Sequence, residues 1–381
     1  MTAVLFGTYD RGHSANRLLR QALAGAGYHV VELHEPLWEE SLVKERAYFG
    51  AASMARLGGR WAGAARRLSA RWREHAASAP LVVTGFGGQL DVLLARAVCR
   101  PRAGLVFAPL VSLSETLVED RGVFPAGGVR ARAVGAIDRA TFAAADLVLA
   151  DTAAHAAYLV ELGAARERVA VLPLGVEPEF LAAPAAAAVP RRVLFYGHHL
   201  PLHGVDTILA AAERLASDVE VVLIGNGPER AALEARGPRG GAGLVWRDDV
   251  PFAELPGELA RASVVLGVFG GGRKASMVVP NKVWQAAAAS RPLVTRDGPA
   301  LREMLTPGEH CVALHAGDPA ALAAAITQLL DDPARAERLG RAARAHVLER
   351  FSPERQAARL RTLLAERLRA PVPAAPGTAA A

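Results

Sequence analysis

Short apolar runs alternate with helical apolar patterns along this chain of 381 residues. In the first half, six runs have the length of buried strands: Ala3–Gly7, His29–Leu33, Leu81–Thr84, Gly104–Phe107, Leu147–Ala150 and Val169–Leu172. Segments with helical spacing of their apolar residues lie between these runs, as at Ser14–Ala24 and Ala153–Leu162. This alternation predicts a parallel sheet covered by helices on both faces.

The second half repeats the pattern after an Ala- and Pro-rich break at Leu181–Arg192. Its predicted strands are Val193–Tyr196, Val219–Ile224, Leu244–Trp246, Val264–Val268 and Pro292–Thr295. We therefore expect an α/β protein with two doubly wound, Rossmann-like domains, 1–180 and 193–350, joined by a linker at 181–192 and facing each other across a cleft. A C-terminal helix at 351–369, able to pack back on the first domain, and a disordered tail at 370–381 complete this prediction.

Composition narrows the class of protein. No run of eighteen uncharged apolar residues occurs, and the apolar start of the chain is too short for a signal peptide. The only cysteines are Cys99 and Cys311, which fits a reducing compartment, so we expect a cytoplasmic protein. The net charge of +6 and the pI near 9.8 favour anionic partners: sugar nucleotides, phospholipid surfaces or nucleic acid.

Two lysines stand out in a chain whose basic residues are almost all arginines. Lys274 and Lys282 lie eight residues apart, beside the glycines at 270–272. A helix start is predicted just before Lys282, with Asn281 as its N-cap. A lysine at a helix N-terminus suits a phosphate, and a glycine loop lets backbone N–H groups approach it, although a flexible surface loop is the alternative. Arg273 breaks the match to a Walker A loop.

Several short motifs follow one another in a characteristic order. They are YGHHLPLHGV at 196–205, IGNGP at 224–228, PNK at 280–282 with WQA after it, RPLV at 291–294, GDP at 317–319 and FS at 351–352. Together they resemble the retaining glycosyltransferases of family four, which have the GT-B fold, in a subgroup with a PNK-type motif. SLSETLVEDR at 112–121 and ADT at 150–152 extend the resemblance more weakly into the first half.

The resemblance implies transfer of a sugar from a nucleoside-diphosphate sugar to an acceptor hydroxyl with retention. The donor would bind the second domain, and a glycan, lipid-linked or small-molecule acceptor would bind the first. No metal ion, other cofactor or nucleic acid is expected. The implied catalytic residues are Lys282, His198 and His203, and the implied nucleotide-binding residues are Gly197, Gly225, Lys274, Asn281, Gln285, Asp249 and Val250.

The chain departs from the family pattern at four positions. Met277 and Gln285 stand where the family has two glutamates, and His198 and His203 stand where it has an arginine and a lysine. We expect Gln285 to hold the ribose. The two histidines, if protonated, would replace the missing cations. Donor affinity would then rise as the pH falls from about 8 to about 6, a range around the free histidine pKa of about 6.5.

These departures keep alternatives open. The histidines at 198, 199 and 203 could hold a metal ion or serve structural roles. Asp248 and Asp249 could be a metal-binding pair, although their place after a strand fits a loop that frames the nucleobase. A sugar-nucleotide-binding protein of the same fold, with little or no turnover, is the alternative function. An isomerase is disfavoured because no set of acids and bases for proton transfer is evident.

Candidate acceptor residues in the first half follow predicted strands. They are Gly12 and His13 after the first strand, Gly87 after the third, and the pair Asp120 and Arg121. A surface histidine and an ordinary ion pair are the plainer interpretations of His13 and of the pair. The stretch Arg56–Arg73 holds tryptophans among arginines, so it is either an amphipathic helix on the inner face of a membrane or a solvated helix packed by its tryptophans.

Overall fold

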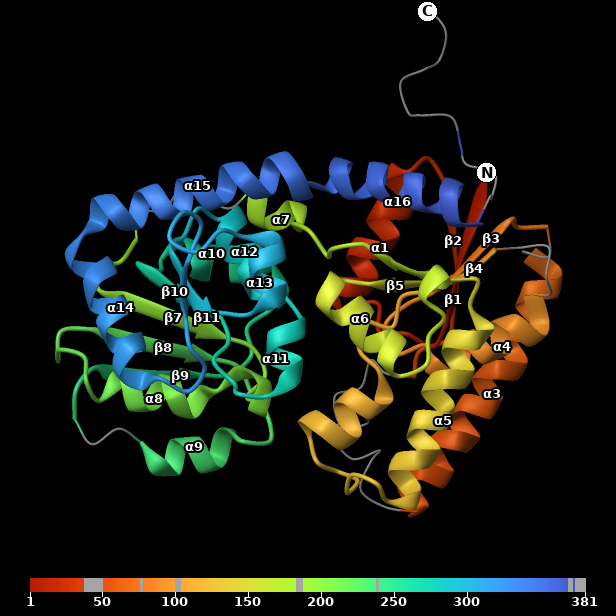
Figure 1. Ribbon diagram of the computed structural model, residues 1–381, viewed down its shortest axis with the longest axis horizontal. Helices are drawn as coiled ribbons and strands as arrows, with labels where there is room; N and C mark the ends of the chain where they lie inside the picture. Colours follow the sequence, from red (N-terminus) through yellow and green to blue (C-terminus); the bar gives the residue numbers. More distant parts are fainter. Residues whose placement is uncertain are drawn as a thin grey trace, which may run out of the picture. The chain divides into compact units, whose positions relative to one another are not determined.

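The computed structural model describes residues 1–37, 51–75, 78–99, 104–182, 188–237, 240–368 and 373. The chain forms two compact units (Figure 1): the first comprises Met1–Leu174 and Pro353–Ala381, and the second comprises Gly175–Ser352. The units therefore divide at residue 175, ahead of the predicted linker. Part of that linker, 183–187, and the predicted tail, apart from residue 373, lie outside the described residues.

The first unit is built on a parallel six-stranded sheet in the order β2-β1-β3-β4-β5-β6. Its strands are β1 (Thr2–Gly7), β2 (His29–His34), β3 (Leu81–Thr84), β4 (Gly104–Phe107), β5 (Leu147–Ala150) and β6 (Val169–Val171). Its helices are α1 (Ser14–Gly25), α3 (Ala51–His75), α4 (Gln89–Cys99), the π-helix η1 (Glu115–Asp120), α5 (Val129–Ala144), α6 (Ala153–Glu161), the short η2 (Arg166–Arg168) and α16 (Pro353–Leu368). All six predicted runs form strands, and the four central strands of the sheet are buried over most of their length.

The second unit has its own parallel six-stranded sheet, in the order β12-β11-β10-β7-β8-β9. Its strands are β7 (Arg192–Tyr196), β8 (Glu220–Ile224), β9 (Gly243–Arg247), β10 (Val264–Leu266), β11 (Leu293–Arg296) and β12 (Val312–Leu314). Its helices are α7 (Pro178–Leu181), the short η3 (Pro201–His203), α8 (Val205–Ala212), α9 (Arg230–Arg236), η4 (Phe252–Glu254), α10 (Leu255–Ala260), α11 (Arg273–Met277), α12 (Asn281–Ala288), α13 (Pro299–Met304), α14 (Pro319–Asp331) and α15 (Pro333–Phe351). The predicted α/β class with two doubly wound sheets is confirmed.

Strand order decides where a ligand can bind. The chain leaves β1 in both directions across the first sheet, and it leaves β7 in both directions across the second. Ligands of doubly wound folds bind at the carboxyl ends of the strands beside such a reversal. The loops after β1 and β3, and those after β7 and β10, are therefore the first places to look for a site.

The arginine-rich helix α3 packs its apolar side against the first sheet. Leu68 and Trp72 are buried in the core, and the indole of Trp61 donates a hydrogen bond to Asp91 at 3.1 Å. The tryptophans of this helix therefore contact the protein. No helix among the described residues is both long enough and apolar enough to cross a membrane.

The last helix, α16, completes the core of the first unit. It packs along α1, where a Cβ atom added at Gly25 would lie only 2.8 Å from that of Ala357. Its Leu360 and Leu364 join Leu23 in one buried cluster. The first unit therefore depends on residues from both ends of the chain.

Truncation of α16 should show this dependence. Leu364→Ala should lower the free energy of unfolding by about 2–5 kcal/mol, since it opens a cavity under a fully buried side chain. Leu348→Ala on α15, where the side chain is 38% exposed, is the matched control and should change it by less than about 0.5 kcal/mol. Urea unfolding followed by circular dichroism measures both. Equal effects would contradict the packing of α16 described above.

Candidate functional site

The candidate donor residues of the second unit meet at the carboxyl edge of its sheet. Gly197 follows β7 and Gly225 follows β8, and a Cβ atom added at Gly225 would lie 2.2 Å from the carbonyl oxygen of Gly197. Lys282 lies in the first turn of α12, beside Gly197. Helix α11, which carries Lys274, contacts η3, which ends at His203. The structure therefore brings most of the implied nucleotide site together.

Gly197 lies beside Lys282 and His203 at this edge of the sheet. Its φ of +131° lies in the region that favours glycine. A Cβ atom there would lie 3.1 Å from Nζ of Lys282 and 3.4 Å from Cε1 of His203. The absence of a side chain at this position leaves the lysine amine and the imidazole next to bare backbone, where a ligand can approach closely.

Lys282 is a buried amine that forms no ion pair with any residue the structure describes. Its side chain is 5% exposed, and Nζ has no hydrogen-bond partner among the described residues. Nζ lies 4.1 Å from the centre of the Phe195 ring, which offers only a weak cation–π contact. Burial lowers the pKa of this amine well below its ordinary value. An anionic ligand would supply both the missing hydrogen bonds and the missing charge.

The start of α12 differs slightly from the prediction. The helix begins at Asn281, so Pro280 occupies the N-cap position and no side chain caps the helix. Pro280 has extended backbone angles, and its ring supplies no hydrogen-bond acceptor. Asn281 Oδ1 is instead buried and without a partner in the described part of the chain. The exact capping residue was wrong, while the helix N-terminus beside Lys282 is present.

The three histidines occupy different environments. His198 is exposed. His203 is buried, and its Nδ1 donates to the carbonyl oxygen of His198. Burial, followed by the positive charge of Lys282, holds the pKa of His203 well below its ordinary value. The neutral form of His203 is therefore favoured, because this imidazole is desolvated beside another cationic group.

His199 is fully buried between aromatic rings. Its ring lies 5.5 Å from Trp246 and 6.1 Å from Phe195, centre to centre, and neither ring nitrogen has a hydrogen-bond partner among the described residues. Burial, then the charges of Arg230 and Lys282, lowers the pKa of His199 to about 4. A neutral imidazole packed in this way does not replace a permanent cation.

Gln285 is held by protein groups. Its amide oxygen accepts a hydrogen bond of 2.6 Å from the Tyr196 hydroxyl, and its amide nitrogen donates to the carboxylate of Glu177. All three side chains are buried. The contacts tie α12 to β7 and to the segment before α7. The amide expected at the ribose is thus engaged inside the second unit.

The acidic residues after β9 are also engaged. Asp249 accepts hydrogen bonds from the backbone and the side-chain nitrogen of Asn226, both at 3.2 Å, and Val250 follows it at this edge. Asp248 forms an ion pair with Arg230 at 3.4 Å. Within the described ranges, no group of three or more potential metal ligands comes together.

In the first unit, the structure separates the predicted acceptor residues into two places. His13 is the N-cap of α1 and accepts a hydrogen bond from Ala15 at 3.3 Å, and its ring lies 4.2 Å from that of Phe86. Gly12 precedes it, and Gly87, with φ of +88°, lies in the turn after β3. Asp120 and Arg121 instead end the π-helix η1.

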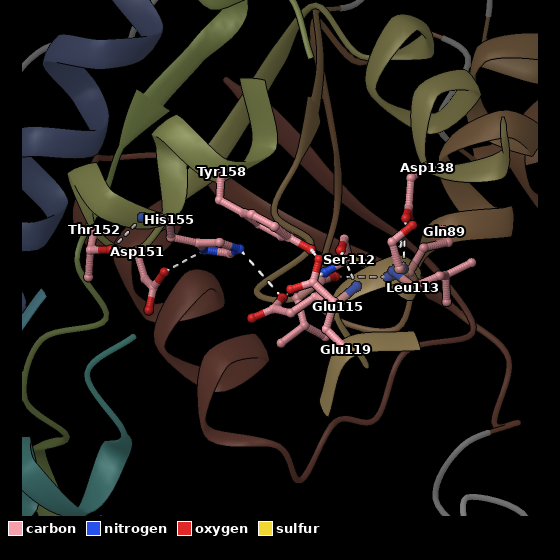
Figure 2. Close-up of polar contacts among 12 residues, drawn as sticks. Gln89, Ser112, Leu113, Glu115, Glu119, Asp138, Asp151, Thr152, His155 and Tyr158 are labelled. Atoms are coloured by element: carbon pink, nitrogen blue, oxygen red, sulfur yellow. Dashed lines mark hydrogen bonds and ion pairs between the residues drawn. The ribbon is translucent and has the colours of Figure 1, made fainter. Parts of the chain in front are cut away.

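A buried cluster that the sequence analysis missed lies between η1 and α6 (Figure 2). His155 is fully buried, and its Nδ1 lies 2.7 Å from Asp151 Oδ1. Its Nε2 lies 3.8 Å from Glu115 Oε2, and Glu115 is also fully buried. Tyr158 donates to Glu119 at 2.9 Å. The spacing of Asp151 and His155, four residues apart at a helix start, is the signal that could have identified the cluster.

Asp91 is a second missed carboxylate. It accepts hydrogen bonds from the Thr8 backbone at 2.7 Å and from Trp61, and it fills the space where Gly7 lacks a side chain. Burial raises its pKa to about 6, against the opposing effect of these hydrogen bonds. Asp91 thus fixes the loop after β1 to α4, at the reversal of strand order in the first sheet.

Comparison with known proteins shows that this chain is similar to glycosyltransferases. Residues 205–362 match the family described as "Glycosyl transferase-like". The chain is 32% identical, over 269 residues, to the D-inositol 3-phosphate glycosyltransferase of Geodermatophilus obscurus. This match covers 63% of the chain and 57% of that relative, so the chain aligns with little more than half the length of the curated relative.

Solved structures of similar fold cover nearly the whole chain. A sucrose-phosphate synthase from Thermosynechococcus elongatus has a TM-score of 0.70 at 18% identity, and the match covers 97% of this chain and 99% of that one. Anabaena HepE in complex with UDP and glucose has a TM-score of 0.67 at 15% identity, with 96% and 100% covered. The two six-stranded parallel sheets and their flanking helices are thus the α/β layout of GT-B glycosyltransferase structures.

Because Lys282 lacks a partner, its replacement should stabilise the ligand-free protein. Lys282→Met should raise the free energy of unfolding by about 1–3 kcal/mol, since it removes a buried unsatisfied donor. The pKa of the amine is lower in the folded than in the unfolded chain, so the folded chain binds fewer protons between the two values. The stability of the native protein therefore rises with pH in that range, and the advantage of the variant shrinks there.

Urea unfolding at several pH values measures this difference. Lys274→Met is the control, because its side chain is only half-buried, and it should shift stability by less than about 0.5 kcal/mol. A loss of stability in Lys282→Met would mean that the lysine is a structural residue.

Proposed function

We propose that this protein is a glycosyltransferase that moves a sugar from a nucleoside-diphosphate sugar to an acceptor hydroxyl, with retention of configuration. The observation that carries the proposal is the buried, unpartnered Lys282 amine beside Gly197 at the carboxyl edge of the second sheet. A diphosphate is the group in such donors that satisfies a buried amine at a helix N-terminus. The match to the glycosyl transferase-like family over residues 205–362 includes Lys282 and begins after Gly197.

The chemistry assigned to Lys282 is electrostatic. Negative charge develops on the diphosphate as it leaves the sugar, and a positioned cation in a desolvated site stabilises that charge. Donor binding raises the pKa of the Lys282 amine again, because the diphosphate replaces the lost water. His203 supplies a neutral imidazole, whose Nε2 accepts a hydrogen bond because Nδ1 donates to His198. Asp249 and Val250 belong to the loop proposed to contact the base.

UDP is the nucleotide to test first, because solved structures of similar fold contain it. The acceptor is proposed to bind the first unit. We place the protein in the cytoplasm. Its contact with an anionic membrane is proposed to rest on exposed arginines of α3, such as Arg60 and Arg66, without insertion of tryptophans.

A nucleotide-sugar-binding protein without turnover is the second candidate. The observation that favours it is that Gln285 and Met277, which replace the two glutamates of the resembling family, are both buried. The amide of Gln285 is also engaged by Tyr196 and Glu177. Binding of a donor without formation of a glycosylated product or free sugar would support this candidate over the enzyme.

The proposal predicts binding of UDP through Lys282. Lys282→Met should weaken UDP binding about 10- to 100-fold, the effect of losing a charge-assisted contact. UDP affinity of the native protein should fall as the pH rises from about 7.5 to about 9.5, since the diphosphate requires the protonated amine. The difference between native protein and variant isolates Lys282 from titration of the nucleotide.

Isothermal titration calorimetry measures both effects, and the anomeric configuration of the product, determined by NMR, tests retention. Lys274→Met serves as the control. Equal UDP affinity in the native protein and Lys282→Met at every pH would refute the site.

Metal independence is the next prediction. Asp249 is hydrogen-bonded to Asn226, and Asp248 is paired with Arg230, so these carboxylates are committed to protein partners. Release of sugar from the donor should therefore proceed at an unchanged rate in excess EDTA. Loss of that rate with chelator, and its recovery with Mg²⁺ or Mn²⁺, would show that the two aspartates bind metal instead.

A further inference from the structure

The first unit contains a pocket that none of the comparisons assigns. It has about 500 Å³ of open space, its mouth included, and it lies between α1, the ends of β5 and β6, and the start of α16. Most of its wall is apolar, with side chains such as Leu18, Leu19, Leu149 and Leu172. A wall that is mainly apolar and carries a few polar groups is typical of small-molecule sites.

Three polar side chains line this pocket, and they differ in their partners. Asn16 is fully engaged, because its amide bonds to the backbone of Asp10 and Phe86. Gln356 is 5% exposed, and neither its amide oxygen nor its amide nitrogen has a hydrogen-bond partner among the described residues. Asp151 is also 5% exposed, and its Oδ2 is buried and without a partner there.

Buried polar groups without hydrogen-bond partners are energetically unfavourable. A buried polar atom without a partner destabilises the folded state, and native proteins leave few of them. Here Asp151 and Gln356 belong to the lining of one pocket, and each has buried side-chain atoms without a partner among the described residues. They come from residues 205 positions apart, so local chain geometry does not account for their meeting. A ligand with hydroxyl groups would satisfy both.

A hydrogen bond to His155 holds the Asp151 carboxylate in place. Its Oδ1 accepts from Nδ1 of His155, which fixes the plane of the carboxylate and leaves Oδ2 for another donor (Figure 2). The other ring nitrogen of His155 faces Glu115 at 3.8 Å. His155 is therefore a positioning residue, and Asp151 is the group that can contact a ligand.

The charges around the pocket select against phosphate. No lysine or arginine belongs to its lining, and the carboxylates of Asp151 and Glu115 add negative charge on the α6 side. A phosphate would be repelled there, and it would find no cation to pair with.

We propose that this pocket binds an uncharged, hydroxyl-bearing group with an apolar face, as the acceptor subsite of the proposed glycosyltransferase. A ligand hydroxyl donates to Oδ2 of Asp151, and the amide of Gln356 donates to and accepts from a second hydroxyl. The apolar face packs on the leucines of α1 and β5. The name of the Geodermatophilus relative includes a sugar-alcohol phosphate, inositol 3-phosphate. A subsite for an uncharged group would not suit that phosphate. The assignment as acceptor subsite rests on the proposed function, while the pocket's preference for an uncharged ligand does not.

The test titrates the full-length protein with phenyl glucoside and cyclohexanediol as neutral probes, and with glucose phosphate as the charged probe, by ligand-observed NMR. Gln356→Met keeps the volume of the side chain and removes the amide that would hydrogen-bond to a ligand. The affinity for the neutral probes should therefore fall about tenfold. Asp151→Asn should lower it similarly. Gln328→Met, at an exposed position on α14 in the other unit, is the matched control and should change nothing.

Two further readouts separate a binding role from a structural one. Gln356→Met should not lower the melting temperature of the free protein, because it removes buried unsatisfied atoms. UDP affinity should be unchanged in all three variants. Neutral probes that fail to bind, or that bind Gln356→Met as well as the native protein, would overturn the proposal, as would tighter binding of glucose phosphate. Failure of UDP to bind the native protein would instead count against the proposed function and leave the probe result intact.

Discussion

The second unit is organised around one unbalanced charge, the amine of Lys282. Burial under β7 leaves it next to Phe195, Gly197 and His203, and no described carboxylate forms an ion pair with it. The buried amine accounts for features of two neighbouring residues. Gly197 lacks a side chain that would cover the amine. Burial, and after it the charge of Lys282, lowers the pKa of His203 and favours its neutral form. An amine kept in this state lowers the stability of the free protein and gains most from an anion.

Each sheet reverses its strand order at one point, beside β1 in the first and beside β7 in the second. The buried charged side chains at the carboxyl ends of the strands differ in sign between the two units. The edge of the second sheet carries Lys282, with Arg230 close by near β8 and β9. In the first unit the corresponding region carries the buried carboxylates Asp91, Glu115 and Asp151. The two proposed ligands, a diphosphate in the second unit and an uncharged hydroxyl-bearing group in the first, call for different electrostatic environments.

The sequence predicted the strands well because most of them are buried on both faces and read as continuous apolar runs. The exception is β12 (Val312–Leu314), a half-buried edge strand of three residues, which was missed. Most of the residues expected at the donor site lie near one another because parallel strands end on one edge. Contacts between distant segments could not be predicted: Glu177 with Gln285, or Gln356 with the pocket holding Asp151, depend on how α7 and α16 return to the sheets. The charge state of His203 likewise depends on burial that no local pattern shows.

Unsatisfied polar atoms alone do not mark a site in this protein. Trp284 Nε1 and two nitrogens of Arg192 are also buried without hydrogen bonds, yet Trp284 packs on Phe351, and Arg192 forms ion pairs with Glu220 and Glu258. These atoms lie within packed or paired surroundings. Lys282 differs because the bare backbone of Gly197 adjoins it at the carboxyl end of a strand, and Asp151 and Gln356 differ because they line an open pocket. An unmet hydrogen bond therefore indicates a ligand only where the fold also leaves space for one to approach.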